Sequence, residues 1–537
     1  MTKKENGFMA KSSVAKSLAY KFSEQFLVKG LGLVISIILA RLLSPTEFGQ
    51  IAIIMVFINL SHSFVQSGLG TALVQNKTAD KRDYSTVFYI SLAVAALLVG
   101  VLWFAAPAIG TFYANDALVL PLRVYAFSLF FFAFNTVQTA KMTREMQFGK
   151  QFVCNLIACV LSGVLGCVLA YLGFGIWSLI AYYFSSSVFV CVAMLFAARW
   201  WPSLTFSLRR AKELFSYGWK MMVSAFLCSL YADIRTLIIG KRFSEEDLGY
   251  YNRGQQFSDV IFASLDSAVQ SVMFPVLSRN QEDREKMKRI LRRTVSYSAL
   301  LSLPILFGMA MVADPFVRVV LTEKWLPSVP FLQIICLGYL ARPLSSACLV
   351  AIKSTGKSGT YMILELIRRL AMLLVLLVSV FAFGTLTAIA WGFLVSTWLD
   401  TLIVSVPTKR IVGYSLWEQW CDISRILLCT LLMGVCIYPI SLLPIPPIAI
   451  LLAQIALGVA VYVAAGFLLR IPAMRELLFM AKRLLRRGKK TEASAETSEE
   501  AIAEKARQDG SGETPVETSA EAPDGDSTEA PSASPEE

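Results

Sequence analysis

The chain has 537 residues, of which 56% are hydrophobic and only 16% are charged. Soluble domains reach about 45–50% apolar residues only when glycine is counted, and about 25% of their residues are charged. The composition therefore excludes a water-soluble enzyme and a disordered or fibrous protein, and the long continuous apolar runs indicate a polytopic α-helical membrane protein rather than a β-barrel.

Fourteen apolar segments of a length suited to membrane helices follow one another along the chain. Most are interrupted by glycine, proline or polar residues, as is common in transport helices. They are expected near residues 20–40, 49–68, 86–108, 118–138, 152–172, 175–198, 215–240, 252–277, 295–320, 329–350, 361–382, 385–407, 425–443 and 446–469.

Lys and Arg residues are distributed unevenly over the connections between these segments. The N-terminal tail, the even-numbered connections and residues 470–490 contain 33 of them, whereas the odd-numbered connections contain 5. Cytoplasmic loops of membrane proteins carry an excess of Lys and Arg. Both termini are therefore predicted to be cytoplasmic, and the connection over 241–251 to be external.

A repeat with an offset of 200 residues relates the two halves of the chain. Ser44-Pro-Thr-Glu-Phe-Gly49 corresponds to Ser244-Glu-Glu-Asp-Leu-Gly249, and Arg41 corresponds to Lys241. Six spans separate the copies, an even number, so both copies cross the membrane in the same direction. The repeat predicts two six-helix bundles related by a pseudo-two-fold axis along the membrane normal, with a cavity between them and two extra C-terminal helices.

These patterns divide the chain into seven parts. Residues 491–537 contain 14 Asp and Glu, 2 Lys and Arg and no aromatic residue, so this acidic tail is predicted to be disordered. The remaining parts are a cytoplasmic N-terminal tail (1–19), a first bundle (20–198), a cytoplasmic linker (199–214), a second bundle (215–407), helices 13 and 14 (408–469) and a basic cytoplasmic segment (470–490).

No motif in the sequence supports an enzyme, a cofactor or a metal site. The segment from Ala351 to Ser358 fits a relaxed phosphate-loop pattern, but it lacks the first glycine and follows a predicted membrane span. The ten cysteines form no C-x-x-C pair, and the single histidine, His62, is interpreted as a packed polar residue. The net charge of +12 is interpreted as loop asymmetry rather than as a nucleic-acid-binding surface.

Several cations lie inside the predicted spans, where each is costly unless it faces a partner or a water-filled cavity. Lys29 and Arg342 are the deepest, and Arg235 lies in the seventh span. These three are candidate substrate-binding residues. A further cluster in the eleventh span has i+3 and i+4 spacings that favour a local ion pair reaching the membrane interface; its members are Glu365, Arg368 and Arg369.

A polar stripe follows one face of the eighth span. Its spacings of 4, 7 and 4 residues keep all members on one helical face; they are Gln255, Asp259, Asp266 and Gln270. Hydrogen bonding between helices would explain any single member equally well, whereas the whole stripe favours an aqueous cavity.

Two polar residues of the second span, Asn59 and Gln66, fall on Asp259 and Asp266 in the repeat and are further candidate substrate-binding residues. Asp233 lies in the seventh span. An embedded carboxylate can bind H⁺ or Na⁺, so Asp233, Asp259 and Asp266 are candidates for coupling transport to an ion gradient.

A set of motifs over about residues 15–470 resembles the polysaccharide transporter flippases, and most closely the lipopolysaccharide, colanic-acid and teichuronic-acid exporter branch. Thr322 stands where this family is expected to have glycine. The motifs are Arg41-Leu-Leu-Ser-Pro-Thr-Glu-Phe-Gly-Gln-Ile-Ala52, Gly68-Leu-Gly-Thr-Ala-Leu-Val-Gln75, Leu248-Gly-Tyr-Tyr-Asn-Arg253, Phe274-Pro-Val-Leu-Ser-Arg279 and Glu323-Lys-Trp-Leu-Pro327.

The resemblance implies the fold of the multidrug/oligosaccharidyl-lipid/polysaccharide superfamily. It implies a transporter that moves oligosaccharide repeat units on a polyprenyl diphosphate across the bacterial cytoplasmic membrane by alternating access. Membrane lipids, a polysaccharide polymerase and the chain-length machinery are the partners to expect. Two alternatives stay open, a drug or cation antiporter of the same superfamily and a non-transporting scaffold of a glycan assembly complex.

Overall fold

A computed structural model of the chain describes residues 27–66, 70, 73–74, 80–471, 473–474 and 476. These residues are helical apart from turns and short connections, and no strand occurs among them. Twelve of the described helices are long and apolar enough to cross a membrane, or thirteen if the bent pair Glu323–Tyr339 and Arg342–Ser354 forms one span. The predicted polytopic all-α class is confirmed. The predicted tails over 1–19 and 491–537 lie outside the described residues, as does most of the basic segment 470–490.

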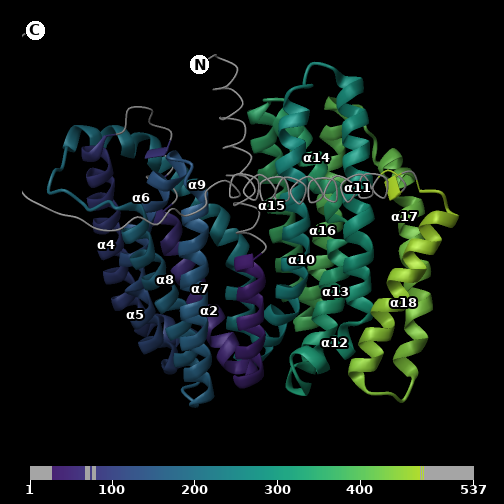
Figure 1. Ribbon diagram of the computed structural model, residues 1–537, viewed down its shortest axis with the longest axis horizontal. Coiled ribbons are helices and arrows are strands. Elements are labelled where there is room, and N and C mark those ends of the chain that lie inside the picture. Colours follow the sequence, from purple (N-terminus) through teal and green to yellow (C-terminus); the bar gives the residue numbers. More distant parts are fainter. Residues whose placement is uncertain are drawn as a thin grey trace, which may run out of the picture. The chain divides into compact units, whose positions relative to one another are not determined.

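The first group of helices occupies the part of the chain predicted as the first bundle (Figure 1). α7 and α8 pack side by side, and α6 packs against α4 and α8. The group consists of a helix over residues 27–42, which begins outside the described residues, and then α2 (Pro45–Gln66), α4 (Lys81–Tyr113), η1 (Asp116–Leu118), α5 (Val119–Ala126), α6 (Ser128–Arg144), α7 (Phe148–Tyr171) and α8 (Ile176–Ala198).

The second group begins with a long helix that packs against both α2 and α4. In the rest of this group, α10, α11, α13, α14 and α16 pack on one another. The group consists of α9 (Leu208–Arg242), α10 (Glu245–Ser278), α11 (Arg284–Met311), α12 (Ala313–Val320), η2 (Glu323–Ser328), α13 (Val329–Tyr339), α14 (Arg342–Ser354), α15 (Ser358–Val378), η3 (Ser379–Phe383) and α16 (Leu386–Ile411).

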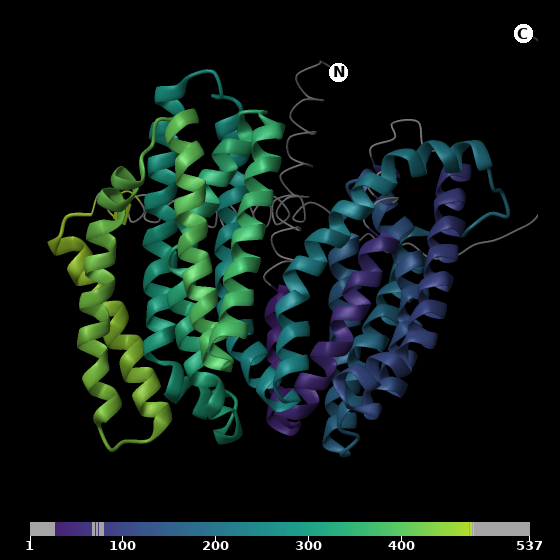
Figure 2. The same cartoon turned by 180° about the vertical axis from the view of Figure 1, so that it is seen from behind.

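The last two long helices lie beside the second group, at the edge shown in yellow-green in Figures 1 and 2. They pack on each other and contact α11 and α12. Tyr462 donates a hydrogen bond to the Leu300 carbonyl at 2.8 Å, which ties the final helix to α11. These elements are α17 (Leu416–Ile437), η4 (Tyr438–Leu442) and α18 (Pro447–Leu468).

The connection predicted over 241–251 is much shorter, because α9 ends at Arg242 and α10 begins at Glu245; its external location stays a prediction. A capping box explains the early start: the Ser244 hydroxyl accepts from the Asp247 amide at 3.0 Å, and the Asp247 carboxylate accepts from the Ser244 amide at 3.3 Å. Arg253 is only 2% exposed and lies inside α10. The predicted linker over 199–214 is also shorter, since α9 begins at Leu208.

The 200-residue repeat reappears as a pair of reciprocal close contacts between α2 and α10. A Cβ atom on Gly49 would lie 1.7 Å from the Glu245 carbonyl oxygen, and one on Gly249 would lie 2.0 Å from the Pro45 carbonyl oxygen. The repeat offset converts one pair into the other. Such self-complementary exchange is the mark of a two-fold axis, here a pseudo-two-fold axis within one chain.

The cations that follow the first and seventh spans make reciprocal contacts too. Arg41 donates to the carbonyls of Val319 and Val320, at the C-terminal end of α12, with an Nε–O distance of 2.7 Å to Val320. Lys241 donates to the carbonyl of Phe112, at the C-terminal end of α4. A cation from each half therefore caps the C-terminal end of a helix in the other half: Arg41 caps α12, and Lys241 caps α4. We call the end of the molecule with residues 41–49 and 241–249 the repeat end; it lies at the bottom of Figures 1 and 2.

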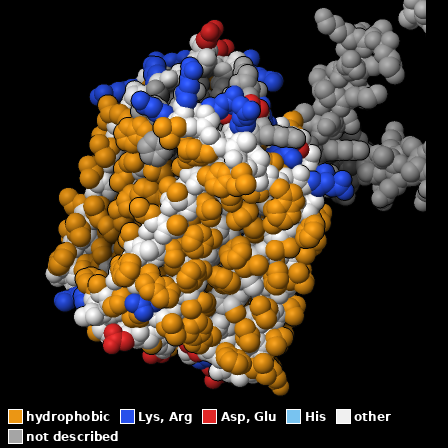
Figure 3. Space-filling view, turned by 90° about the vertical axis from the view of Figure 1, so that its left-hand side faces the viewer, with side chains coloured by type: hydrophobic (Ala, Val, Ile, Leu, Met, Phe, Trp, Pro, Cys, Tyr) orange, Lys and Arg blue, Asp and Glu red, His pale blue; other side chains and the backbone are white. Residues whose placement is uncertain are grey.

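Side chains on the face shown in Figure 3 are segregated along the direction of the helices. Apolar side chains cover the middle, Lys and Arg gather at the upper end, and Asp and Glu with few cations lie at the lower end. The broad apolar belt suits the hydrocarbon core of a bilayer, and the two charged ends suit its two aqueous faces.

Candidate functional site

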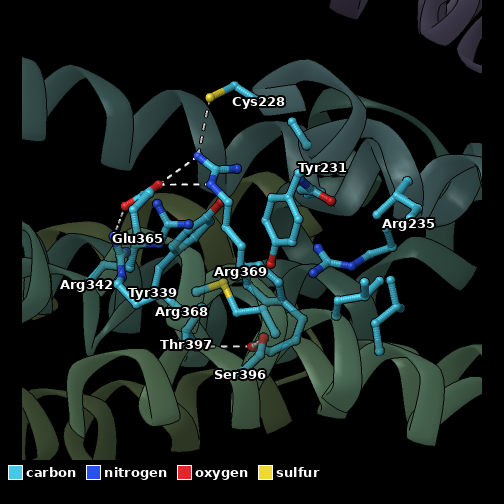
Figure 4. A pocket seen from close by; sticks show the side chains of 17 residues that line it. Cys228, Tyr231, Arg235, Tyr339, Arg342, Glu365, Arg368, Arg369, Ser396 and Thr397 are labelled. Atoms are coloured by element: carbon cyan, nitrogen blue, oxygen red, sulfur yellow. Dashed lines mark hydrogen bonds and ion pairs between the residues drawn. The ribbon is translucent and has the colours of Figure 1, made fainter. Parts of the chain in front are cut away.

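A polar cavity of about 370 Å³ lies between α9, α10, α13, α14, α15 and α16 (Figure 4). Its wall contains one carboxylate, Glu365, and four arginines, which are Arg235, Arg342, Arg368 and Arg369. We call it the arginine cavity. The excess of guanidinium groups makes it suited to an anionic ligand.

A break in the tenth span places Arg342 in this wall. α13 and α14 meet at an angle of 42°, and Arg342 is the first residue of α14. The centre of its guanidinium lies 5.1 Å from the Tyr339 ring centroid and 5.4 Å from the Phe262 ring centroid. Within the part of the chain that the structure describes, no carboxylate forms an ion pair with this side chain. Aromatic faces therefore hold Arg342 in place without neutralising its charge.

Arg235 projects from α9 into the same cavity (Figure 4). Its guanidinium lies 4.7 Å from the Phe393 ring centroid, and its Nε atom is buried without a hydrogen-bond partner among the described residues. A buried donor that makes no hydrogen bond costs free energy. Arg235 and Arg342 are thus the two arginines of the wall whose charge no described carboxylate pairs.

The other two arginines are paired. Arg368 donates to Asp400, with an Nη2–Oδ2 distance of 3.0 Å, and to Glu365 at 2.7 Å. Arg369 donates to the same Glu365 at 2.7 Å. The predicted local ion pair is present, but the cluster lines the cavity together with the unpaired arginines. Its second carboxylate, Asp400, is 3% exposed and was not singled out from the sequence, although it is the only acidic residue of α16.

The two carboxylates of the α10 stripe are hydrogen-bonded to α13 and α14. Asp259 accepts from the Tyr339 hydroxyl and from Gln255 at 3.1 Å. Asp266 accepts from the Ser346 hydroxyl and from Gln270 at 2.6 Å. Each stripe carboxylate therefore has one partner on a neighbouring helix and one on α10 itself.

Asp266 also lines a smaller cavity of about 130 Å³ beside the arginine cavity. The two cavities share Arg342 and Arg368 in their walls. Both interpretations of the stripe therefore apply: its carboxylates form hydrogen bonds between helices, and part of the stripe faces a polar cavity.

The structure does not bring all predicted site residues together. Arg235 and Arg342 share the arginine cavity, whereas Lys29, Asn59 and Gln66 do not line it. Lys29 is exposed on the helix over 27–42, and Asn59 is exposed on α2. The side chain of Asn59 interacts by hydrogen bonding with Asp233 of α9, so this pair connects α2 to α9.

A family model described as "Polysaccharide biosynthesis protein" matches residues 38–330, more than half of the chain. The chain belongs to this family. It is 28% identical over 389 residues to the succinoglycan biosynthesis transport protein ExoT of Rhizobium meliloti (strain 1021), covering 72% of this chain and 76% of ExoT. It is 25% identical over 386 residues to the teichuronic acid biosynthesis protein TuaB of Bacillus subtilis (strain 168), covering 70% and 78% respectively. The resemblance to polysaccharide flippases is confirmed.

Two solved structures share the fold of this polysaccharide biosynthesis protein. The lipid II flippase MurJ in an inward closed conformation has a TM-score of 0.70 at 15% identity, covering 84% of this chain and 98% of MurJ. An inward-facing multidrug resistance MATE family transporter of the MOP superfamily has a TM-score of 0.56 at 17% identity, covering 72% and 94%. The expected two-bundle transporter fold is confirmed.

Proposed function

We propose that the protein moves oligosaccharide repeat units, linked to a polyprenyl diphosphate, across the bacterial cytoplasmic membrane for cell-surface polysaccharide biosynthesis. The arginine cavity carries this proposal, because its wall holds four arginines and one carboxylate. Membership of the polysaccharide biosynthesis family supports a glycan substrate. The names of its relatives, which refer to succinoglycan transport and to teichuronic acid biosynthesis, support the same class.

The chemistry of the substrate matches the cavity. A diphosphate cannot enter hydrocarbon alone, and charge-assisted hydrogen bonds from arginine forks offset its loss of water. Arg235 and Arg342 form no ion pair with a described carboxylate, so their positive charges can attract such a ligand.

Alternating access follows from the two-bundle fold. The reciprocal contacts at the repeat end join the two bundles there, so separation of the bundles at that end requires these contacts to break. From the distribution of Lys and Arg we propose that the repeat end is external and that both termini are cytoplasmic. Roles in substrate binding for Lys29, Asn59 and Gln66, coupling to H⁺ or Na⁺, and association with a polysaccharide polymerase and chain-length machinery stay predictions.

The two alternatives are less well supported. A cation or drug antiporter needs acidic groups facing its cargo, whereas the arginine cavity has an excess of basic ones. A scaffold needs no polar cavity inside the membrane, where each embedded charge is costly.

A reconstitution experiment tests the proposal. Full-length protein in liposomes should expose a fluorescent lipid-linked oligosaccharide to an impermeant quencher, and Arg235→Gln and Arg342→Gln should abolish most of this exposure. Arg342→Lys should keep part of it, because the charge survives while the planar fork is lost. Arg123→Gln is the control: Arg123 is an arginine of α5 that hydrogen-bonds the Trp103 carbonyl and does not line the cavity.

Two results would reject the proposal. Movement of a cationic dye without movement of the lipid-linked oligosaccharide would identify an antiporter. Movement of neither, by a correctly folded protein, would identify a scaffold.

A further inference from the structure

An apolar groove of about 640 Å³ lies between α4, α9 and η3 near the repeat end. Its wall is almost entirely hydrocarbon, from residues such as Ala108, Leu237, Val380 and Phe381. Lys241 and Arg242 are the charged side chains of this wall. A groove of this size falls within the range of about 300–1,000 Å³ that is usual for ligand sites.

The groove lies next to the arginine cavity along α9 and at the junction of α15 and η3, although no described residue lines both. On α9, Arg235 lines the cavity, and Leu237 and Ile238, less than one turn further on, line the groove. On the other side, Leu376 of α15 lines the cavity and Val380, one turn further on, lines the groove. A ligand with an anionic head in the cavity would thus meet a hydrocarbon wall directly beside it.

The backbone is irregular where the groove is formed. Residues Ser379–Phe383 form a π-helical turn, a feature that is rare and is frequent at functional sites. Phe381 in this turn lines the groove and is 83% exposed. Gly392 of α16 lets the turn pack closely, because a Cβ atom there would lie 2.0 Å from the Ser379 hydroxyl oxygen.

We propose that this groove holds the polyprenyl chain of the carrier lipid while its diphosphate occupies the arginine cavity. The inference rests on the proposed function. A hydrocarbon chain cannot remain in a cavity lined by guanidinium groups, so a bound carrier needs an apolar exit beside its head group. The closeness of the two walls along α9 and at the α15–η3 junction favours the carrier over an ordinary phospholipid, whose phosphate would instead sit at Arg242.

Photo-crosslinking tests the assignment. A photoreactive amino acid replaces Ala108 in the groove or, as a control, Leu97, which is 66% exposed on the same helix but does not line the groove. The full-length protein in phosphatidylcholine nanodiscs then receives a radiolabelled polyprenyl diphosphate. We expect about tenfold more crosslinking at position 108 than at 97, and suppression of the signal at 108 by Arg342→Gln or by excess inorganic diphosphate.

A second readout separates this proposal from the proposed function. Cys228 is exposed and lines the arginine cavity, and a background without the exposed Cys421 and Cys436 makes its labelling by a maleimide specific. Polyprenyl diphosphate should protect Cys228. If it does not, the diphosphate site is wrong. If Cys228 is protected but position 108 crosslinks no more than position 97, or crosslinks phospholipid regardless of the probe, the groove assignment alone is overturned.

Discussion

The arginine side chains of the cavity differ in the groups that they contact. Arg368 is bound by two carboxylates, one of them the buried Asp400, whereas Arg342 is held by aromatic rings. Removal of one partner from a buried ion pair leaves an uncompensated charge. Substitution of Arg368 should therefore mainly lower the stability of the protein, whereas substitution of Arg342 should mainly lower its transport activity.

Arg368→Gln should destabilise the protein by about 3–5 kcal/mol, because Asp400 is left buried without its cation. The expected result is a lower melting temperature and lower abundance in membranes, measured by fluorescence-based thermal unfolding. The double variant Arg368→Gln, Asp400→Asn should recover part of the loss, since no buried charge then remains unpaired. Equal melting temperatures of Arg368→Gln and Arg342→Gln would contradict this distinction.

The carboxylates on α9 and α10 are the candidates for ion coupling. Asp233, Asp259 and Asp266 each have hydrogen-bond partners, which Asn can partly preserve while it removes the charge. We expect at least one of the three Asp→Asn variants to flip substrate without dependence on an imposed H⁺ or Na⁺ gradient. Normal transport and unchanged gradient dependence in all three would show that their role is structural.

At the scale of helices, the two halves approach each other through their backbones at the repeat end. Gly49 and Gly249 let the first turns of α2 and α10 touch, and Gln50 donates to Glu245 at 2.8 Å across the same contact. Buried Arg253 adds a hydrogen bond to Ser36 at 2.8 Å. The repeat end is thus joined by short-range contacts that tolerate no added side chain.

Gly49→Val should prevent this close approach, because the added Cβ atom would meet the Glu245 carbonyl. Overpacking typically costs about 1–3 kcal/mol, so we expect a lower melting temperature and reduced flipping, and Gly249→Val should behave alike. Gly100→Val on α4 is the control, since nothing lies within 4 Å of a Cβ atom there. An unchanged melting temperature and unchanged flipping in Gly49→Val would show that the repeat end does not need this contact.

At the scale of the whole molecule, the charged ends decide how the protein sits in the membrane. Lys and Arg gather at the end opposite to the repeat end on the face in Figure 3. Arg284 begins α11 at the basic end, and Glu323, 83% exposed, begins η2 at the repeat end. Cytoplasmic loops retain such basic residues, so the two positions should face opposite sides.

Cysteine labelling in whole cells measures this orientation. In a background without the exposed cysteines, a cysteine at Glu323 should react with an impermeant maleimide added from outside, whereas one at Arg284 should react only after the membrane is permeabilised. The reverse pattern would invert the topology and place the repeat end in the cytoplasm.

Most of the fold could be predicted from the sequence, because membrane helices are long continuous apolar runs and the backbone must satisfy its own hydrogen bonds in lipid. The 200-residue repeat likewise predicted two related halves. The connection predicted over 241–251 was drawn too long, because the capping box at Ser244 starts α10 earlier than the apolar run alone suggests.

The site could be predicted only in part. Arg235 and Arg342 stood out because an embedded cation is costly wherever it lies. The sequence could not show that Glu365, Arg368 and Arg369 line the same cavity as these two arginines. An ion pair with i+3 and i+4 spacing has the same sequence pattern at the membrane interface and in the protein interior. It also could not show that Lys29 lies outside that cavity, that Asp400 pairs with Arg368 across 32 residues, or that an apolar groove adjoins the arginines. Those facts depend on which helices become neighbours, and tertiary packing alone decides that.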